Sequence, residues 1–263
     1  MPRLKNFVSS ILLAFGYSIN SKSKKKLLGD LIRLPEDVGL SSVEARKIYK
    51  SSKSQLGQDL LALIASGAKK PGFFVEFGSA DGVALSNSFL LEKEMGWSGI
   101  LCEPSRSWHE DLKRNRSCIV DTRCVYSRTG ERISFSENYI GELSGITEFT
   151  GNDHHGILDR TTTSYQVETI SLLDLLKSHK APKHIEFLSV DTEGSEFEIL
   201  NAFDFSQHTF GAICVEHNYL ENRPKVKQLL EANGYRQVYR ELSEFDDWFV
   251  PQLSQTEQPH TCE

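Results

Sequence analysis

The sequence predicts an open, doubly wound α/β domain in which helices cover both faces of a mostly parallel sheet of about seven strands. Three observations lead to this prediction. Short apolar runs rich in Val, Ile and Phe alternate with helical stretches along most of the chain, which is the pattern of βαβ units. A glycine turn follows the first long run directly, at residues 78–82. The last two strand-like runs, 235–240 and 245–250, have no helix between them and predict a closing antiparallel pair.

The composition is that of a soluble globular protein. Of the 263 residues, 39% are hydrophobic and 25% are charged, and the formal net charge is -6. This charge argues against a general nucleic-acid binder, which usually presents a basic face. The five cysteines lack C-x-x-C spacing and are odd in number, so they predict neither a disulfide framework nor a zinc cluster. We therefore expect a cytoplasmic protein in a reducing compartment.

We expect three parts in the chain: a helical extension over residues 1–50, an α/β domain over 51–251 and a flexible tail over 252–263. Residues 4–26 predict an amphipathic helix with basic flanks, too short to span a bilayer. Such a helix either makes peripheral contact with the inner face of an anionic membrane or docks on the domain or on a second subunit of an oligomer. Its apolar residues recur at helical spacing: Leu4, Val8, Ile11, Leu12, Phe15 and Ile19.

Residues 73–104 predict the βαβ unit at the centre of the domain. The apolar run 73–77 is typical of a buried parallel strand, and it breaks into the glycine turn, where a missing Cβ permits close approaches. A helical stretch from about 84 to 95 and a second strand over 99–102 follow, and Glu103 ends that strand. In a doubly wound sheet, ligands bind outside the carboxyl ends of the strands. Glu103 is therefore placed to accept hydrogen bonds from ribose hydroxyls.

The glycine pattern is neither G-x-G-x-x-G nor a phosphate P-loop, which disfavours a dinucleotide or a triphosphate. The pattern that remains is E-x-G-x-x-x-G, from Glu76 through Gly78 to Gly82, followed by the strand-terminal Glu103. It resembles the first two motifs of class I S-adenosylmethionine-dependent methyltransferases. The resemblance implies that Glu76 lies near the amino-acid end of the cofactor, Gly78 beneath it and Glu103 on its ribose.

The rest of the chain continues the alternation. Tyr126 and Ser127 follow the third strand, where an adenine edge would lie, and the long stretch 138–164 has weak periodicity. Loops of that length are usually functional or disordered, and we expect this one to be the acceptor-binding lid. The remaining elements are expected as helical segments over 27–50 and about 58–64, a helix over 107–116, a strand over 118–125, a β segment over 131–136, a strand over 165–170, a helix over 171–179, a strand over 185–190, a helix opened by Glu193, a strand over 210–215 and a helix over 224–232.

Seven segments from about Ser51 to Val250 together resemble the FkbM family of methyltransferases. The resemblance implies a Rossmann-like class I fold, S-adenosylmethionine as methyl donor, and O-methylation, commonly of sugar hydroxyls in glycans or of natural products. It extends a cofactor-binding role to Gln58, Ser79, Asp81, Gly82 and Asn87, although the family often has Ala and Asn where Ser79 and Ala80 stand. The segments are SQLGQD at 54–59, FFVEFGSADGVALSN at 73–87, LEKEMGWSGILCEP at 91–104, NR at 115–116, ETISLLDLL at 168–176, SVDTEGSEFEIL at 189–200 and VEHN at 215–218.

Methyl transfer to a hydroxyl requires in-line alignment and either a base that takes the proton or a metal that acidifies the hydroxyl. Asp191 closes one strand, and Glu216, His217 and Asn218 close its neighbour. His217 is the preferred base because imidazole titrates near neutral pH, with Asp191 facing the cofactor crevice beside it. Alternatively, Asp191 with Glu216 or Asn218 holds Mg²⁺ through oxygen ligands, in the position of the metal of catechol-type O-methyltransferases.

The leading hypothesis is a cytoplasmic O-methyltransferase of polysaccharide biosynthesis, acting on a carbohydrate hydroxyl in a glycan or glycoconjugate. One alternative is a catalytically silent methyltransferase-fold scaffold in a glycan-assembly complex. Another is a methyltransferase of a small natural product. The residues Asp246, Asp247 and Trp248 either shape the acceptor pocket or form a turn and an edge strand.

Overall fold

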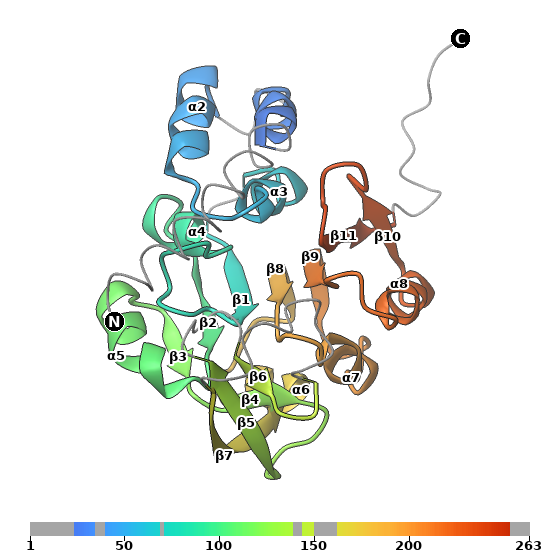
Figure 1. Cartoon of the computed structure of the whole chain (residues 1–263). Coiled ribbons are helices and arrows are strands. Elements are labelled where there is room, and N and C mark those ends of the chain that lie inside the picture. Colours follow the sequence, from blue (N-terminus) through green and yellow to red (C-terminus); the bar gives the residue numbers. More distant parts are fainter. Residues whose placement is uncertain (1–23, 35–39, 69–70, 139–143, 150–161, 253–263) are drawn as a thin grey trace.

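The computed structural model describes residues 24–34, 40–68, 71–138, 144–149 and 162–252. They form a seven-stranded sheet with the order β10-β11-β9-β8-β1-β2-β3 and a four-stranded sheet with the order β4-β7-β5-β6. Figure 1 shows helices on both sides of the larger sheet. The strand order reverses between β1 and β8, which makes this a doubly wound sheet. The predicted fold class is therefore confirmed.

The larger sheet is parallel except at one edge. Its parallel strands are β1 (Phe73–Phe77), β2 (Ser98–Cys102), β3 (Ile119–Asp121), β8 (His184–Val190) and β9 (Thr209–Glu216). β11 (Asp246–Pro251) pairs antiparallel with both β9 and β10 (Tyr235–Val238). This is the closing antiparallel pair that the missing crossover helix predicts.

Both faces of the larger sheet are buried, which explains why its strands are continuous apolar runs. On one face the strands pack against α6, α7 and α8 through residues such as Val75, Leu188 and Leu230. On the other they pack against α3, α4 and α5 through residues such as Phe74 and Leu60. The helices are α2 (Ser42–Ser51), α3 (Gln58–Ala65), α4 (Phe89–Lys93), α5 (His109–Asn115) after the 3₁₀ turn η2 (Arg106–Trp108), α6 (Leu172–Ser178), α7 (Glu196–Asn201) and α8 (Arg223–Ala232).

Two elements differ from the sequence-based expectation. The helix expected over 84–95 is reduced to α4, because the Ser86 and Ser88 side chains and the Asn87 N–H bind the Glu76 carboxylate. Local polar groups of this kind compete with helical hydrogen bonds. The strand expected over 118–125 divides into β3 and β4 (Cys124–Tyr126), which belong to different sheets.

The small sheet follows β3 in the chain. It consists of β4, β5 (Arg132–Asn138), β6 (Gly145–Ile146) and β7 (Thr162–Ser171). The Tyr165 hydroxyl connects it to η2, since it accepts the Arg106 N–H at 3.0 Å and donates to Glu137 Oε2 at 2.6 Å. The expected lid over 138–164 thus includes β6 and the start of β7, while residues 139–143 and 150–161, with the pair His154-His155, lie outside the described residues.

Part of the N-terminal extension belongs to the core of the domain. Residues 24–32 are helical, and Leu27 and Leu31 are fully buried in the same apolar cluster as Leu60 and Trp248. The predicted amphipathic helix falls mainly on residues 1–23 and the predicted tail on 253–263, which both lie outside the described residues. Within the described ranges, no helix has both the length and the apolarity that a bilayer crossing requires.

Candidate active site

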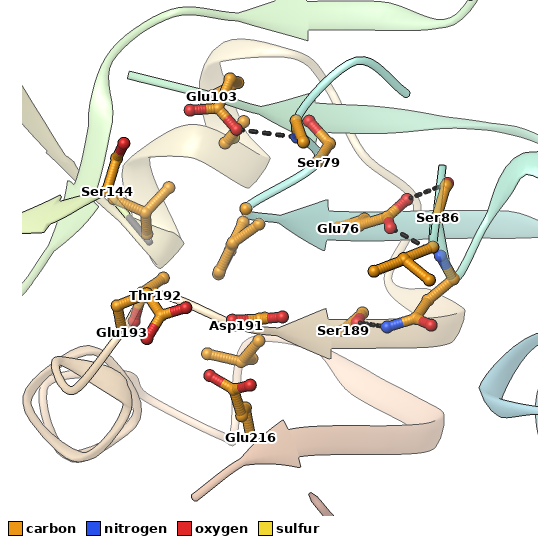
Figure 2. A pocket seen from close by; sticks show the side chains of 18 of the residues that line it. Glu76, Ser79, Ser86, Glu103, Ser144, Ser189, Asp191, Thr192, Glu193 and Glu216 are labelled. Atoms are coloured by element: carbon orange, nitrogen blue, oxygen red, sulfur yellow. Dashed lines mark hydrogen bonds between the residues drawn. The ribbon is translucent and has the colours of Figure 1, made fainter. Parts of the chain in front are cut away.

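A cavity of about 500 Å³ opens at the carboxyl ends of β1, β2, β8 and β9, a size typical of small-molecule sites. Phe135 and Ile146 of the small sheet also line it. Figure 2 shows labelled polar side chains from the neighbouring strand ends around this space. Nine of the sequence-predicted site residues line the cavity: Gln58, Glu76, Gly78, Ser79, Asp81, Asn87, Glu103, Asp191 and Glu216.

Gly78 lies where the ends of β1 and β8 meet. Its φ is +70°, and a Cβ at this position would lie 2.1 Å from the Asp191 backbone oxygen. Glycine is therefore required both for the backbone conformation and for the close approach. Gly82 also has a positive φ, but a Cβ there would meet the side chains of Leu112 and Arg116. The expectation that Gly82 contacts the cofactor does not match this geometry, because Gly82 faces α5 and does not line the cavity.

Glu103 lies at the end of β2, as its position in the sequence predicts. Its carboxylate accepts the N–H groups of Ala80 and Ser105, each at 2.8 Å. Burial raises the pKa of Glu103 to about 7, against the opposing effect of these two donors. Each carboxylate oxygen retains capacity for another hydrogen bond, so Glu103 can accept donors from a ligand.

Ser79 is a second polar group at this end of the cavity. Its side chain is buried, and within the described structure its hydroxyl has no hydrogen-bond partner. A buried hydroxyl without a partner costs free energy unless a ligand or water satisfies it. Ser79 and Glu103 together therefore provide the hydrogen-bonding groups that a ribose needs.

Glu76 and Asp81 line the cavity, but the glycine turn and the loop after it use their carboxylates. Glu76 accepts the Ser86 hydroxyl at 3.1 Å and the Asn87 N–H at 2.7 Å. Asp81 Oδ1 accepts the N–H groups of residues 83 and 84, both at 2.8 Å. These two acids therefore shape the loop that borders the cavity. Asn87 donates to the Ser189 hydroxyl at 3.0 Å and leaves its Oδ1 without a partner in the described structure.

Gln58, the first residue of α3, connects this helix to β11. Its Nε2 donates to Asp246 Oδ2 at 2.6 Å, and its Oε1 accepts the Leu56 N–H at 2.9 Å. Burial raises the pKa of Asp246 to about 6. Asp246 lines the cavity, which favours the acceptor-pocket alternative for this residue. Its neighbour Asp247 instead forms two hydrogen bonds with Arg223, at 2.9 and 2.8 Å.

Three carboxyl groups meet at the ends of β8 and β9. One oxygen each from Asp191, Glu193 and Glu216 lies within 4.8 Å of the others. Burial raises the pKa of Asp191 to about 7, and burial with the neighbouring Asp191 raises the pKa of Glu216 well above its ordinary value. Two buried carboxyl groups this close together do not both ionise readily, so the pair binds a proton more tightly than two separate carboxyl groups would.

The loop after β8 presents Glu193 to this cluster. Glu196 accepts the N–H groups of Thr192 at 2.9 Å and Gly194 at 3.0 Å, and Glu193 between them has a left-handed φ of +58°. The sequence pattern predicted only that Glu193 opens a helix. Its position two residues after a strand-end acid and immediately before a glycine is the signal that could have indicated its place in the cavity.

The candidate metal ligands in the structure differ from those that the sequence predicted. Oxygen ligands from Asp191, Glu193 and Glu216 have the chemistry that Mg²⁺ prefers. Asn218, the predicted third ligand, does not line the cavity, and its backbone N–H bonds to the Phe245 oxygen at 3.3 Å. Glu193 thus occupies the place that the sequence assigned to Asn218.

His217 lies outside the large cavity. Successive side chains of a strand point to opposite faces, so Glu216 at the end of β9 faces the cavity and the next residue does not. The His217 Nδ1 accepts the Tyr219 N–H at 3.0 Å, and its Nε2 is 3.7 Å from Asp247 Oδ1. Burial lowers the pKa of His217. The expectation that His217 is the general base does not match this position.

The third strand contributes different residues from those predicted. Tyr126 packs against Phe149, with ring centroids 6.3 Å apart, and neither Tyr126 nor Ser127 lines the cavity. Cys124 and Val125 line it instead, together with Trp108. The wall near Glu103 is therefore mainly apolar, as a nucleobase requires, but it begins two residues earlier than the sequence suggested.

The family model described as "Methyltransferase FkbM domain" matches residues 76–237. No curated protein sequence matches the chain. Among solved structures, a precorrin-6Y C5,15-methyltransferase from Geobacter metallireducens is similar at 12% identity and a TM-score of 0.39, over 74% of this chain and 87% of that one. Because the family model covers more than half of the sequence, the chain belongs to the FkbM family of methyltransferases.

Proposed function

We propose that the protein is an S-adenosylmethionine-dependent O-methyltransferase that methylates a sugar hydroxyl in a glycan or glycoconjugate. One observation carries this proposal. A single cavity is lined by Glu103, whose carboxylate can accept ribose hydroxyls, and by the neighbouring carboxyl groups of Asp191 and Glu216. Methyl transfer to an alcohol needs these two functions side by side.

The residues present fit the nucleoside of this cofactor. The unpartnered hydroxyl of Ser79 and the carboxylate of Glu103 line the same cavity. Gly78 lies between them and Asp191, where its missing Cβ lets the ends of β1 and β8 meet. Val125 and Trp108 supply an apolar wall. An acidic group on ribose hydroxyls at the end of the second strand is a recurring solution in doubly wound folds.

The chain's own residues can perform the proton chemistry. Bound S-adenosylmethionine would supply an electrophilic methyl group. The hydroxyl oxygen that attacks it must lose its proton, and the Asp191–Glu216 pair at the ends of β8 and β9 can take that proton. With a pKa near 7, Asp191 is close to the value at which a general base is most effective at neutral pH. The alternative is Mg²⁺ held by Asp191, Glu193 and Glu216, which would acidify the hydroxyl.

The polar lining supports a polyol acceptor. Besides the carboxyl groups, the cavity is lined by uncharged hydrogen-bonding side chains that can both donate and accept. They are Gln55, Gln58, Ser79, Ser86, Asn87, Ser144, Ser189, Thr192 and Ser195. A hydroxyl-rich natural product would also fit, and a catalytically silent scaffold would keep the fold without using the cavity.

Two measurements test the proposal. Calorimetry with S-adenosylmethionine separates an enzyme from a silent scaffold, which need not bind it. A transfer assay with labelled cofactor against the host's glycan extracts, followed by linkage analysis, then identifies the methylated sugar and the position of its hydroxyl. Label on a sugar oxygen supports the proposal. A protein that does not bind the cofactor, or that methylates only small natural products, refutes it.

A further inference from the structure

The cavity has a one-sided charge distribution. Its described lining residues include seven carboxyl side chains and no lysine, arginine or histidine. A cavity wall with one sign of charge and low dielectric focuses its field on whatever enters. The seven are Glu76, Asp81, Glu103, Asp191, Glu193, Glu216 and Asp246.

Four of the seven carboxyl groups lie at the β8 and β9 end: Asp191, Glu193, Glu216 and Asp246. At the other end, the carboxylates of Glu76, Asp81 and Glu103 each accept at least two backbone or hydroxyl donors. At the β8 and β9 end, Asp191 and Glu216 belong to the cluster whose oxygens lie within 4.8 Å of one another. Asp246 is close enough to act electrostatically on both.

Among the described residues, three arginines near this cavity are committed to other groups. Arg116 contacts Glu92 at 2.5 Å, and Arg223 is held by Asp247 at 2.8 Å. The Arg106 guanidinium lies 4.1 Å from the centroid of the Tyr165 ring. None of these three cations lines the cavity, so in the described structure they do not offset the carboxyl cluster.

We infer that this cluster makes the site selective for positive charge beside the transferred methyl group, with Glu193 as the specificity-determining residue. The acceptor is then a neutral or amine-bearing hydroxyl compound, and one with a carboxylate or phosphate next to the reacting hydroxyl is excluded. This inference rests on the proposed function. Its physical reason is that like charges placed together in a cavity cost much binding free energy, whereas a cation there is stabilised.

Cofactor analogues test the inference without an acceptor. Sinefungin carries an amine where S-adenosylhomocysteine has a neutral thioether, and the two are otherwise closely matched. We expect the full-length protein, in EDTA, to bind sinefungin at least about tenfold more tightly. Glu193→Gln should reduce this ratio and Glu193→Lys should abolish it. The exposed Glu221→Gln, which is not in the cavity wall, is the control and should leave the ratio unchanged.

The outcomes separate the inference from the proposed function. Equal affinities for the two analogues, or a ratio that survives Glu193→Lys in a variant with wild-type thermal unfolding, overturn the charge selectivity and leave the methyltransferase proposal standing. A protein that binds neither analogue overturns both.

The acceptor provides the second test. In the labelled glycan extract, linkage analysis should find the methyl group on neutral or amino sugars. Incorporation into uronic acids or phosphosugars should be about a hundredfold lower, or less. A methylated uronic acid or phosphosugar as the main product, with or without added Mg²⁺, overturns the inference.

Discussion

Gly78 and Asp191 are in such close contact that a Cβ on residue 78 would lie 2.1 Å from the Asp191 backbone oxygen. The floor of the cavity is therefore a contact between the ends of β1 and β8, with Glu103 on one side and the carboxyl cluster on the other. This contact couples the fold to the site. A change that separates the two strand ends should impair both stability and cofactor binding.

Gly78→Ala tests this coupling. The new Cβ meets backbone that cannot move aside, and the residue keeps an unfavourable φ of +70°. We expect a loss of at least about 3 kcal/mol in the free energy of unfolding in urea, with weakened cofactor binding. Gly130→Ala is the matched control, since its φ is +83° with nothing within 4 Å of the added Cβ, and it should cost about 1 kcal/mol. Equal losses in the two variants would contradict the argument.

Glu103 should make cofactor affinity depend on pH. Its pKa is raised to about 7 by burial, and ribose hydroxyls donate best to the ionised carboxylate. Affinity should therefore rise as the pH increases from 6 to 8, by up to about tenfold per pH unit below the pKa. Glu103→Gln should bind weakly and with a smaller pH dependence, while the exposed Glu110→Gln should behave as wild type. Calorimetry at several pH values measures the cofactor affinity. If the affinity of Glu103→Gln depends on pH as steeply as that of the wild type, Glu103 does not bind the ribose.

The same group should affect the stability of the unliganded protein. Its folded pKa of about 7 exceeds the value of about 4.3 expected when unfolded, so between these values the folded state binds more protons. The Glu103 contribution to the free energy of unfolding should therefore fall as the pH rises from about 4.3 to 7. Urea unfolding of wild type and Glu103→Gln across this range measures the difference, which should change with pH above about 4.3 and level off below it. A difference independent of pH would contradict the raised pKa.

Asn115 should hold the glycine turn at residues 78–82 in place for cofactor binding. Its side chain donates to the Asp81 backbone oxygen at 2.8 Å, so Asn115→Ala removes a bond worth about 1 kcal/mol. We expect severalfold weaker cofactor binding and an unchanged KM for the acceptor. Arg114→Ala is the control, because Arg114 forms an exposed pair with Asp111 on the same helix. Equal effects on both substrates would indicate a general loss of structure rather than positioning.

Asp191 and His217 should differ in their effect on turnover. Because Asp191 lines the cavity and His217 does not, Asp191→Asn should lower kcat by on the order of a hundredfold. His217→Asn should leave kcat within a few-fold of wild type. Single-turnover transfer of labelled methyl measures the step directly. The reverse result would restore His217 as the base and would require its ring to move into the cavity.

Chelation separates the two routes for activating the acceptor. We expect turnover to persist in EDTA, because the neighbouring carboxyl groups of Asp191 and Glu216 can themselves take the proton. Activity that vanishes in EDTA and returns with Mg²⁺ would instead show that these carboxyl groups act as metal ligands. In that case Glu193→Gln should raise the Mg²⁺ concentration needed for half-maximal activity.

The sequence alone determined the fold and the edge of the sheet where the site lies. Strand and helix periods, the glycine turn and the acids that end β2, β8 and β9 are local properties of the chain. Parallel strands then bring their carboxyl ends to one edge whatever the details of packing. The places of Glu103, Asp191 and Glu216 at that edge therefore follow from their positions in the sequence.

Only the tertiary structure decided which side chains enter the cavity. Glu216 rather than His217 faces it, because a shift of one residue reverses the direction of a side chain on a strand. Tyr126 does not line the cavity and packs against Phe149 instead. Gln58 and Asp246 are 188 residues apart and meet at 2.6 Å, a contact that no local pattern encodes. Glu193 joined the cluster because Glu196 holds its loop. These choices depend on packing between distant segments, and the chemistry of the site depends on them.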